Sequence, residues 1–530
     1  MLRSVFSSGE VRAGALSGLL TALSKPPLPF GPLAWVALVP MLVVLFSSRR
    51  QREGDPLRWR WLALSYGITC HLLELHWLIL LGDASPLNPR WMLPFLLILL
   101  TLYTTLPDFI VIGVLARIRG RHGNRAIWWL PAVWVLGEWA RQFGDLGFPW
   151  LGLGTSQLRI LPVLQLAGVF GELGVTLFVV WVNLLVALIW LRARGEFPRI
   201  GATVLARMWA PTTLLLLFSS VLVYGTSVMR DLDAPVPEEE QLVVGVVQAN
   251  VNLHDKWNPA RRDSTFVPYT RGTESVALEG ARLTVWAETA LTYDLPSRRP
   301  EYERLARLAR ETGSYILTGY VERQIDDEGK LESSNSVLLL GPDSSLHGNY
   351  RKMHLLAFGE TMPFQSLIPA LGRIDMGQAE WVPGTERTLF DVDGHRFAVM
   401  VCFESIFSRF ARDAVAGGAA LLVNVTNDGW FGDTIVPRQH GWMAAMRAAE
   451  NRVPLVRVAN NGISFVADPT GRVHGMTGLF TRESFAMAVT PRPGGSFYSR
   501  YGDGPLFLLL ALASIFLLFV GRREDRGFVS

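Results

Sequence analysis

The sequence predicts a membrane helical bundle joined to an α/β domain with a buried sheet. Hydrophobic residues make up 50% of the chain and charged residues only 18%, whereas soluble proteins average about 25% charged residues. Long apolar segments fill residues 1–230, a mixed polar stretch follows, and one more apolar run closes the chain. We therefore expect transmembrane helices in 1–230, a globular domain in 231–500, and a last transmembrane helix with a tail in 501–530.

Eight segments are apolar over about the length that crosses a membrane. A helix needs roughly 20 predominantly apolar residues to span the hydrocarbon layer. The first segment is the weakest, because Lys25-Pro26-Pro27 cuts it short. We expect about eight transmembrane helices, near residues 10–24, 32–48, 61–81, 91–117, 126–142, 162–191, 209–228 and 505–520.

The placement of arginine predicts the orientation of these helices. Short cytoplasmic loops carry an excess of Lys and Arg. Residues 49–60 hold five arginines, 117–125 hold four, and Arg192, Arg194, Arg199 and Arg207 follow the sixth span. These stretches alternate with the arginine-poor loops 82–90 and 143–161. Both termini are therefore expected in the cytoplasm and the globular domain outside it.

The basic loops also explain the net charge of +4, so no nucleic-acid partner is expected.

From residue 241 onward, short β-branched runs alternate with helical stretches. Runs that are apolar on both faces predict an α/β domain with a buried sheet. Polar residues directly follow several of these runs: Glu288 follows TVWA, Cys402 follows VMV, and Asn427-Asp428 follow LLVNVT. Because such sheets place their chemistry at strand ends, we expect a functional site there.

Cysteine and lysine are both rare in this chain. Cys70 and Cys402 are its two cysteines, and they lie in different predicted domains, so Cys402 is expected to be a free thiol. Lysine occurs only at positions 25, 256, 330 and 352, among 50 basic residues. Lys352 therefore indicates a site that needs a compact ammonium group rather than a guanidinium. An exposed surface lysine and a core-filling cysteine are the structural alternatives.

Glu288, Lys352 and Cys402 together offer the functions of an acyl-transfer site. A nucleophilic thiol needs a base to accept its proton and a nearby cation, and the developing oxyanion needs a donor. Each residue has a structural alternative when taken singly, and their combination favours catalysis.

His440 has no second His or carboxylate at ligand spacing, so no metal is expected.

Several motifs resemble known proteins. WAETA around Glu288, YRKMHLLAFGE around Lys352, VCFES around Cys402 and the long TNDGWFGDTIVPRQH stretch resemble the nitrilase superfamily of carbon-nitrogen hydrolases. With the membrane spans and EWARQFGDLGFPWLGLGTSQ at 138–157, the chain resembles the apolipoprotein N-acyltransferase family over nearly its whole length. The resemblance implies a nitrilase-like α-β-β-α sandwich as the globular domain.

The same resemblance implies roles for the three residues. Glu288 would be the general base, Lys352 would stabilise the tetrahedral intermediate, and Cys402 would carry the acyl chain as a thioester. The implied acyl donor is a phospholipid, and the implied acceptor is the N-terminal amine of a diacylglyceryl-apolipoprotein. No cofactor is implied, because the donor is already an activated ester. The implied location is the bacterial cytoplasmic (inner) membrane, with the catalytic domain on the periplasmic side and the protein a monomer.

Further residues match the family pattern with less direct roles. Glu360 and Glu404 match carboxylates that support the triad, and Trp257 matches an aromatic residue near the site; buried hydrogen bonding and packing are their alternatives. Asn427, Asp428, Trp430 and Arg447 are expected to fix loops around the pocket. The sequence departs from the usual pattern at three positions, with Ala287 and Ala357 in place of proline and Phe403 in place of tyrosine.

Two stretches have the composition to admit acyl chains. GFPWLGLG (147–154) carries aromatics suited to the headgroup level, and FQSLIPALGRIDMG (364–377) has the composition of an apolar lid. An ordinary packed loop or helix is the alternative for each.

Two other functions remain open from the residues alone. One is a membrane-tethered nitrilase or amidase that hydrolyses a small amide, although a single anchor would suffice for it. The other is a transporter or assembly scaffold. Few charges lie within the spans, chiefly Glu74, Glu138 and Glu172, and this gives little sign of an ion pathway.

Overall fold

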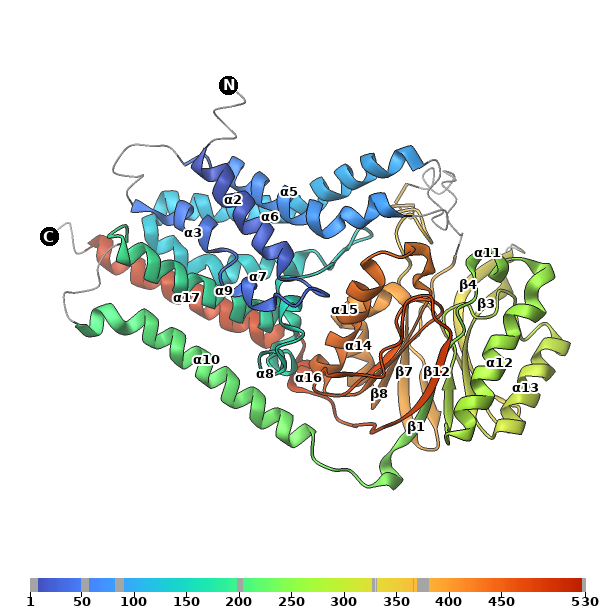
Figure 1. The fold of residues 1–530 in the computed structure, drawn as a ribbon. Coiled ribbons are helices and arrows are strands. Elements are labelled where there is room, and N and C mark those ends of the chain that lie inside the picture. Colours follow the sequence, from blue (N-terminus) through green and yellow to red (C-terminus); the bar gives the residue numbers. More distant parts are fainter. Residues whose placement is uncertain are drawn as a thin grey trace.

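The computed structural model describes residues 8–48, 57–81, 90–197, 204–326, 329, 331–365, 367–368 and 381–526. Apolar helices gather on one side of the molecule and two β-sheets on the other (Figure 1). Most of the predicted loops 49–60 and 82–90, Arg199, Lys330 and residues 369–377 of the predicted lid lie outside the described residues.

Each of the eight predicted spans overlaps a helix. By length and apolar composition, four helices within the described ranges are able to cross a membrane, at Trp59–Leu80, Arg90–Ala140, Ala167–Ala193 and Met208–Leu232. Gly31–Phe46 and Gly504–Phe519 are shorter apolar helices. A membrane domain is thus supported, while the number of eight crossings stays a prediction. The helices are α2 (Gly9–Leu23), α3 (Val39–Phe46), α5 (Trp59–Leu75), α6 (Leu93–His122), α7 (Leu130–Ala140), α9 (Ala167–Ala193), α10 (Val204–Leu232) and α17 (Gly504–Arg526).

Proline and glycine explain local features of this bundle. Pro40, Pro94 and Pro131 lie in the first turns of α3, α6 and α7, where a missing N–H costs nothing. A Cβ at Gly14 of α2 would stand 2.4 Å from the carbonyl oxygen of Leu62 in α5. Small residues therefore let these two helices pack backbone to backbone, as is common between membrane helices.

The globular domain contains two six-stranded sheets. Their strand orders are β12-β1-β2-β3-β4-β5 and β11-β10-β9-β8-β7-β6. The central pairs β1–β2–β3 and β7–β8–β9 are parallel, and the outer pairs are antiparallel. The strands are β1 (Leu242–Gln248), β2 (Leu283–Val285), β3 (Tyr315–Ile325), β4 (Leu331–Leu340), β5 (Leu346–Arg351), β6 (Leu389–Val392), β7 (His395–Val401), β8 (Leu421–Thr426), β9 (Leu455–Ala459), β10 (Phe465–Ala467), β11 (Val473–His474) and β12 (Glu483–Val489).

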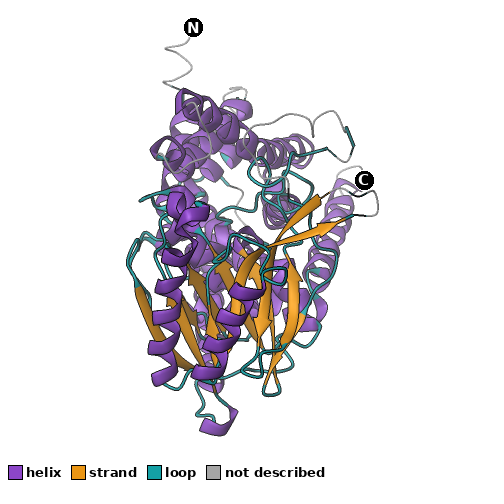
Figure 2. Cartoon of the chain, turned by 90° about the vertical axis from the view of Figure 1, so that its right-hand side faces the viewer, coloured by secondary structure: helices purple, strands orange, loops and turns teal. Residues whose placement is uncertain are grey.

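The two sheets face each other between two layers of helices (Figure 1), and Figure 2 shows the helices that lie across the face of one sheet. Valine and leucine side chains of β1, β2 and β4 share one core with those of β7, β8 and β9. Helices α12 (Arg262–Leu278) and α13 (Arg299–Thr312) pack on the first sheet. Helices α14 (Ser408–Ala416) and α15 (Val436–Asn451) pack on the second. The predicted α-β-β-α sandwich is confirmed.

Helix α15 joins the sandwich to the membrane helices. One face packs on the second sheet through Met443 and Ala448, and the opposite face brings Met446 and Ala449 into a core with residues of α9. Nearly every residue of α15 is therefore buried. Helix α15 lies between the helical bundle and the strands of the second sheet (Figure 1).

Candidate active site

Cys402 lies at the carboxyl end of β7 and begins the 3₁₀ turn η9 (Cys402–Ile406). Its φ of +52° is uncommon for a residue with a side chain and marks a sharp, over-determined turn. The turn is held because the Cys402 carbonyl accepts hydrogen bonds from Ser405 Oγ at 2.9 Å and His440 Nε2 at 3.1 Å. The strand-to-turn geometry thus fixes where the thiol points.

Glu288 and Lys352 come from the other sheet and meet near this turn. Glu288 follows β2, and Lys352 follows β5. Lys352 Nζ lies 3.6 Å from Glu288 Oε1 and 2.7 Å from Glu360 Oε2. Asn335 Nδ2 donates to Glu288 Oε1 at 2.8 Å and to Glu360 Oε1 at 3.2 Å. One ammonium and one amide therefore hold two carboxylates side by side.

The charges around Cys402 set its protonation state. Burial raises the pKa of the thiol, Glu288 raises it further, and Lys352 acts in the opposite direction. Burial alone would lower the pKa of Lys352, but Glu360 and Glu288 outweigh it and raise that pKa above its usual range. With its side chain 1% exposed, Lys352 stays a cation, whereas the thiol stays protonated until a base takes its proton.

We call η9 the nucleophile turn because it begins at Cys402, the predicted nucleophile. Glu404 connects this turn to the segment after Lys352. Its carboxylate accepts hydrogen bonds from the backbone N–H groups of Val401 at 2.7 Å, Met353 at 2.7 Å and His354 at 3.0 Å. The hydroxyl of Tyr350 donates to it as well. Burial raises the pKa of Glu404, against these hydrogen bonds. These hydrogen bonds tie the turn to the segment after Lys352, and a supporting role of Glu404 for the triad stays a prediction.

Trp257 and Lys256 lie at the end of the short helix α11 (Leu253–Lys256). Trp257 is 41% exposed. Its neighbour Lys256 is buried, and its Nζ donates to the Glu288 carbonyl oxygen at 2.9 Å. Burial lowers the pKa of Lys256 to about 7, although Glu288 acts to raise it. Lys256 and Asn335 are thus the site residues that the sequence reasoning missed, and the rarity of lysine was a signal for the first.

A buried polar network lies behind the nucleophile turn. His440 Nδ1 is 3.0 Å from Asp428 Oδ1, and Arg457 Nη2 is 2.8 Å from Asp428 Oδ2. Asn460 Nδ2 donates to Asn427 Oδ1 at 3.2 Å. Both ring nitrogens of His440 are thus engaged in holding the turn.

Within the described part of the chain, the group of side chains spaced for a metal ion is Cys70, His71 and Glu74 in α5.

The outward loop predicted to admit lipid is packed against the sandwich. Trp150 and Leu153 are buried, and Trp150 Nε1 donates to Gln439 Oε1 at 3.3 Å. Phe403 is one of the positions that depart from the family pattern. Its phenyl ring stacks on that of Phe148, with ring centroids 6.2 Å apart. The geometry favours the packed-loop alternative for residues 147–154.

The described start of the predicted lid is apolar and exposed. Leu367 is 82% exposed and Ile368 is 51% exposed. The backbone N–H of Phe364 donates to Asp145 Oδ2 at 2.8 Å, which links the start of the predicted lid to the loop after α7. The motion of a lid stays a prediction.

Comparison with known proteins gives the class of the chain. Residues 243–490 match the carbon-nitrogen hydrolase family, and residues 17–185 match the apolipoprotein N-acyltransferase N-terminal domain. A mutant of Nesterenkonia AN1 amidase, from the nitrilase superfamily, covers 48% of this chain and 93% of its own at 18% identity, with a TM-score of 0.38. The two family matches, together with the apolar helices, show that the chain combines a carbon-nitrogen hydrolase domain with an apolar helical domain.

Full-length relatives narrow this class to one family. The apolipoprotein N-acyltransferase of Geobacter metallireducens is 32% identical over 96% of this chain and 95% of its own length. That of Gloeobacter violaceus is 31% identical over 98% of this chain and 97% of its own. The chain belongs to the apolipoprotein N-acyltransferase family.

Proposed function

We propose that this enzyme transfers a fatty acyl chain from a phospholipid to the N-terminal amine of the S-diacylglyceryl-cysteine of apolipoproteins, the last step of bacterial lipoprotein maturation. The observation that carries this proposal is that Lys352 Nζ lies 3.6 Å from Glu288 Oε1 and that both charges act on the pKa of the Cys402 thiol, although the three residues follow separate strands. Family membership over nearly the whole chain supports it. We propose these three residues as the catalytic triad.

The first half-reaction forms an acyl-enzyme. Cys402 Sγ attacks the ester carbonyl carbon of the phospholipid while Glu288 accepts the thiol proton. The carbonyl oxygen becomes an oxyanion beside the Lys352 ammonium. When the tetrahedral intermediate collapses, the carbon–oxygen bond breaks, and the leaving alkoxide takes the proton from Glu288. A lysophospholipid departs, and the acyl chain stays on Cys402 as a thioester.

The second half-reaction reverses these roles. The free α-amine of the diacylglyceryl-cysteine attacks the thioester carbonyl carbon and gives a proton to Glu288. Collapse of the second tetrahedral intermediate breaks the carbon–sulfur bond, and the Cys402 thiolate recovers its proton from Glu288. The product is an amide, and the enzyme returns to its starting state. Because donor and acceptor supply all the bonds that change, the reaction calls for no cofactor.

Neighbouring residues keep the triad in a reactive arrangement. Glu360 bonds to Lys352 Nζ and accepts from the backbone N–H of Leu356 at 2.8 Å, so it fixes the ammonium rather than acting as a base. Desolvation and Glu288 raise the pKa of the Cys402 thiol, so the attack requires Glu288 to take the thiol proton. This arrangement limits side reactions of the thiol between turnovers.

The location follows from the substrates and from the arginine pattern. We propose a multi-pass protein of the bacterial cytoplasmic (inner) membrane, with residues 231–500 on the periplasmic side between the seventh and eighth spans. Both substrates are lipids anchored in the outer leaflet. A catalytic domain tied at both ends searches that leaflet laterally, which raises the effective concentration of substrate.

Intact-mass measurement after incubation with phospholipid tests the mechanism. The wild-type chain is expected to gain one fatty-acyl mass, and Cys402→Ala is expected to gain none. Adding a diacylglyceryl-cysteine peptide is expected to remove the adduct and to yield the N-acyl peptide. An adduct that persists in Cys402→Ala would contradict the thioester. Equally fast loss of the adduct to water without peptide would favour the tethered hydrolase instead.

A further inference from the structure

A buried ionic clasp joins membrane helix α9 to the sandwich. Arg447 of α15 is fully buried, and its Nη2 lies 3.0 Å from Glu172 Oε2 in α9. Its Nε lies 3.1 Å from Glu450 Oε2. One guanidinium is thus shared between a carboxylate of the membrane domain and a carboxylate of its own helix. We refer to Glu172, Arg447 and Glu450 as the clasp.

A kink in α9 forms the other half of this contact. Phe170 and Gly171 leave helical geometry, and Gly171 has a φ of +66°. The next residue, Glu172, therefore has a backbone N–H without a partner in its own helix, as at a helix start. This N–H donates to Glu450 Oε1 at 2.9 Å. The two domains are bonded in both directions, since Arg447 binds the Glu172 side chain and Glu450 binds the Glu172 backbone.

The clasp also reaches the nucleophile turn. Arg447 Nη1 donates to the carbonyl oxygen of Ile406 at 3.2 Å and to Ser408 Oγ at 2.6 Å. Ile406 is the last residue of η9, the turn that begins at Cys402. The first residue of that turn is held by His440, within the sandwich. The turn is therefore fixed at one end by the catalytic domain and at the other by a cation whose counter-charge lies in a membrane helix.

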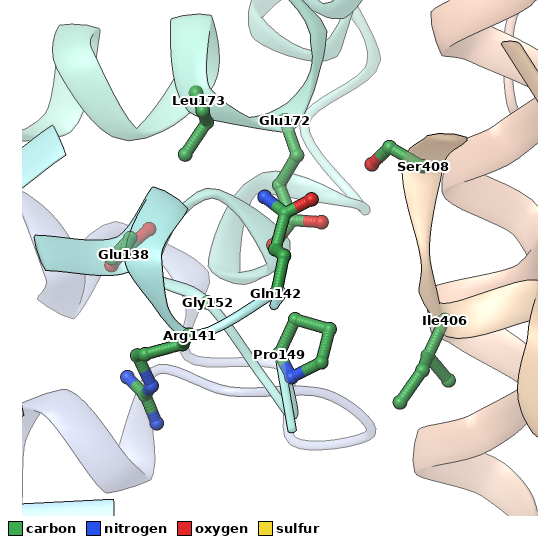
Figure 3. Close-up of a pocket in the computed structure, with 9 residues that line it drawn as sticks. All are labelled: Glu138, Arg141, Gln142, Pro149, Gly152, Glu172, Leu173, Ile406 and Ser408. Carbon is green, nitrogen blue, oxygen red and sulfur yellow. The ribbon is translucent and has the colours of Figure 1, made fainter. Parts of the chain in front are cut away.

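The surroundings of Glu172 make these bonds strong. A cavity of about 20 Å³ lies between the bundle and the nucleophile turn (Figure 3) and is lined by Glu138, Glu172, Ile406 and Ser408, among others. That volume holds about one water molecule. Arg447 is fully buried and the Glu172 side chain is 14% exposed, so their charges interact at a dielectric below that of water. A Cβ at Gly152 would lie 2.4 Å from Glu172 Oε1, which shows how closely the outward loop confines this carboxylate.

We propose that Glu172 is a positioning residue for Cys402, acting through Arg447 on the end of the nucleophile turn. This inference rests on the role of Cys402 proposed above. It makes docking on the membrane helices a condition of reactivity, because the sandwich alone lacks one of the two counter-charges of Arg447. A displacement of about 1 Å at a reacting group can cost on the order of 100-fold in rate, so a small shift of this turn is sufficient.

The test compares thiol reactivity in full-length variants. Glu172→Gln keeps the shape of the side chain and removes its charge. We expect the alkylation of Cys402 by iodoacetamide, and acyl-adduct formation from phospholipid, both to slow by about tenfold or more. For the lipid reaction the loss is expected in kcat with KM little changed. Cys402→Ala supplies the background for both measurements.

Glu138→Gln is the matched control. Glu138 lines the same cavity, but it bonds to the backbone N–H of Leu153 at 2.9 Å and to Thr176 Oγ1 at 2.7 Å rather than to Arg447. In Glu138→Gln, the alkylation rate of Cys402 is expected to equal that of the wild type. Arg447→Lys is expected to slow the alkylation of Cys402 as Glu172→Gln does. The variant that carries both substitutions is expected to react no more slowly than the slower single variant, because both residues act through the same contact.

Two results would overturn the proposal. One is an alkylation rate of Glu172→Gln within twofold of the wild type. The other is an equal loss in Glu138→Gln, which would indicate general damage to the interface. Should Glu172→Gln not fold, Arg447→Lys decides by the same criterion. If the wild type forms no acyl adduct while its Cys402 alkylation still depends on Glu172, the thioester mechanism fails and the positioning role stands.

Discussion

At the scale of single residues, the protonation states of the site depend on which charged groups are buried beside one another. Lys352 remains an ammonium because Glu360 and Glu288 face it. Cys402 remains a thiol because burial and Glu288 oppose its ionisation. In the proposed mechanism, Lys352 is then the donor to the oxyanion and Cys402 is a nucleophile that needs a base. Both pKa values are raised, so both groups keep their protons, one as a cation and the other as a neutral thiol.

Replacing Lys352 by arginine tests the need for a compact ammonium. The planar guanidinium is larger and spreads its charge, so Lys352→Arg is expected to lower the rate of acyl-adduct formation by about 100-fold, the usual cost of losing one oxyanion donor. Thermal unfolding of the variant gives the control, because the fold must be retained. A variant with near wild-type acylation would assign the oxyanion to another donor.

Lys256 predicts a pH dependence of stability with a defined sign. Burial lowers its pKa from about 10.5 to about 7, so between these values the unfolded chain binds the extra proton. Stability of the wild type relative to Lys256→Met is therefore expected to rise as pH increases from about 7 to about 10.5, and to be flat below 7. Thermal unfolding midpoints of both proteins across this range measure the difference. A difference that falls with pH would contradict the buried-amine assignment.

Individual site residues were predictable from the sequence where two signals coincided. Lys352 combined rarity with the YRKMHLLAFGE motif, and Glu288 and Cys402 each directly follow an apolar strand. Lys256 is an equally rare lysine, but it lies on a helix rather than at a strand end. Its position in the sequence therefore did not indicate a site residue. Asn335 lies within β4, and a strand asparagine becomes a site residue only through the pairing of that strand with its neighbours.

At the scale of elements, the helices and strands of the sandwich followed from their apolar runs, whereas the bend of α9 did not. Residues 162–191 read as one uninterrupted apolar span, because hydrophobicity does not register backbone angles. In the structure the helix breaks at Phe170 and Gly171. The break exists because Glu450 and Arg447 bind the groups that it exposes. A partner more than 270 residues away in sequence leaves no local pattern.

Replacing Gly171 by alanine tests the kink. Gly171 has positive φ, and a Cβ there would lie 2.6 Å from the Tyr498 ring, so both strain and a clash are expected. Gly195 provides the control, since its φ is +65° with open space around it. Gly195→Ala is expected to cost about 1 kcal/mol from strain alone, and Gly171→Ala about 3 kcal/mol with the added clash. Equal unfolding midpoints for the two variants would argue against close packing at the kink.

At the scale of the whole molecule, the domains form one working unit because α15 is shared between two cores. One of its faces completes the sandwich and the other completes the bundle. The sequence predicts each domain separately from its own composition, but not their contact, because small residues such as Ala448 and Ala449 suit many kinds of packing. The clasp and the aromatic contact of Phe148 with Phe403 then tie the nucleophile turn to the membrane side.

Orientation in the membrane is the last prediction, and it is tested by labelling engineered cysteines in a Cys402→Ala background, where the remaining Cys70 is buried. Arg121, exposed in the last turn of α6, belongs to an arginine-rich stretch expected in the cytoplasm. Leu278, at the end of α12, is 91% exposed on the sandwich. A membrane-impermeant thiol reagent is expected to label Leu278→Cys in intact spheroplasts and Arg121→Cys only after lysis, because charged loops of this kind stay inside. The opposite pattern would place the catalytic domain in the cytoplasm, away from outer-leaflet lipids, and would remove the physical basis of the lateral search.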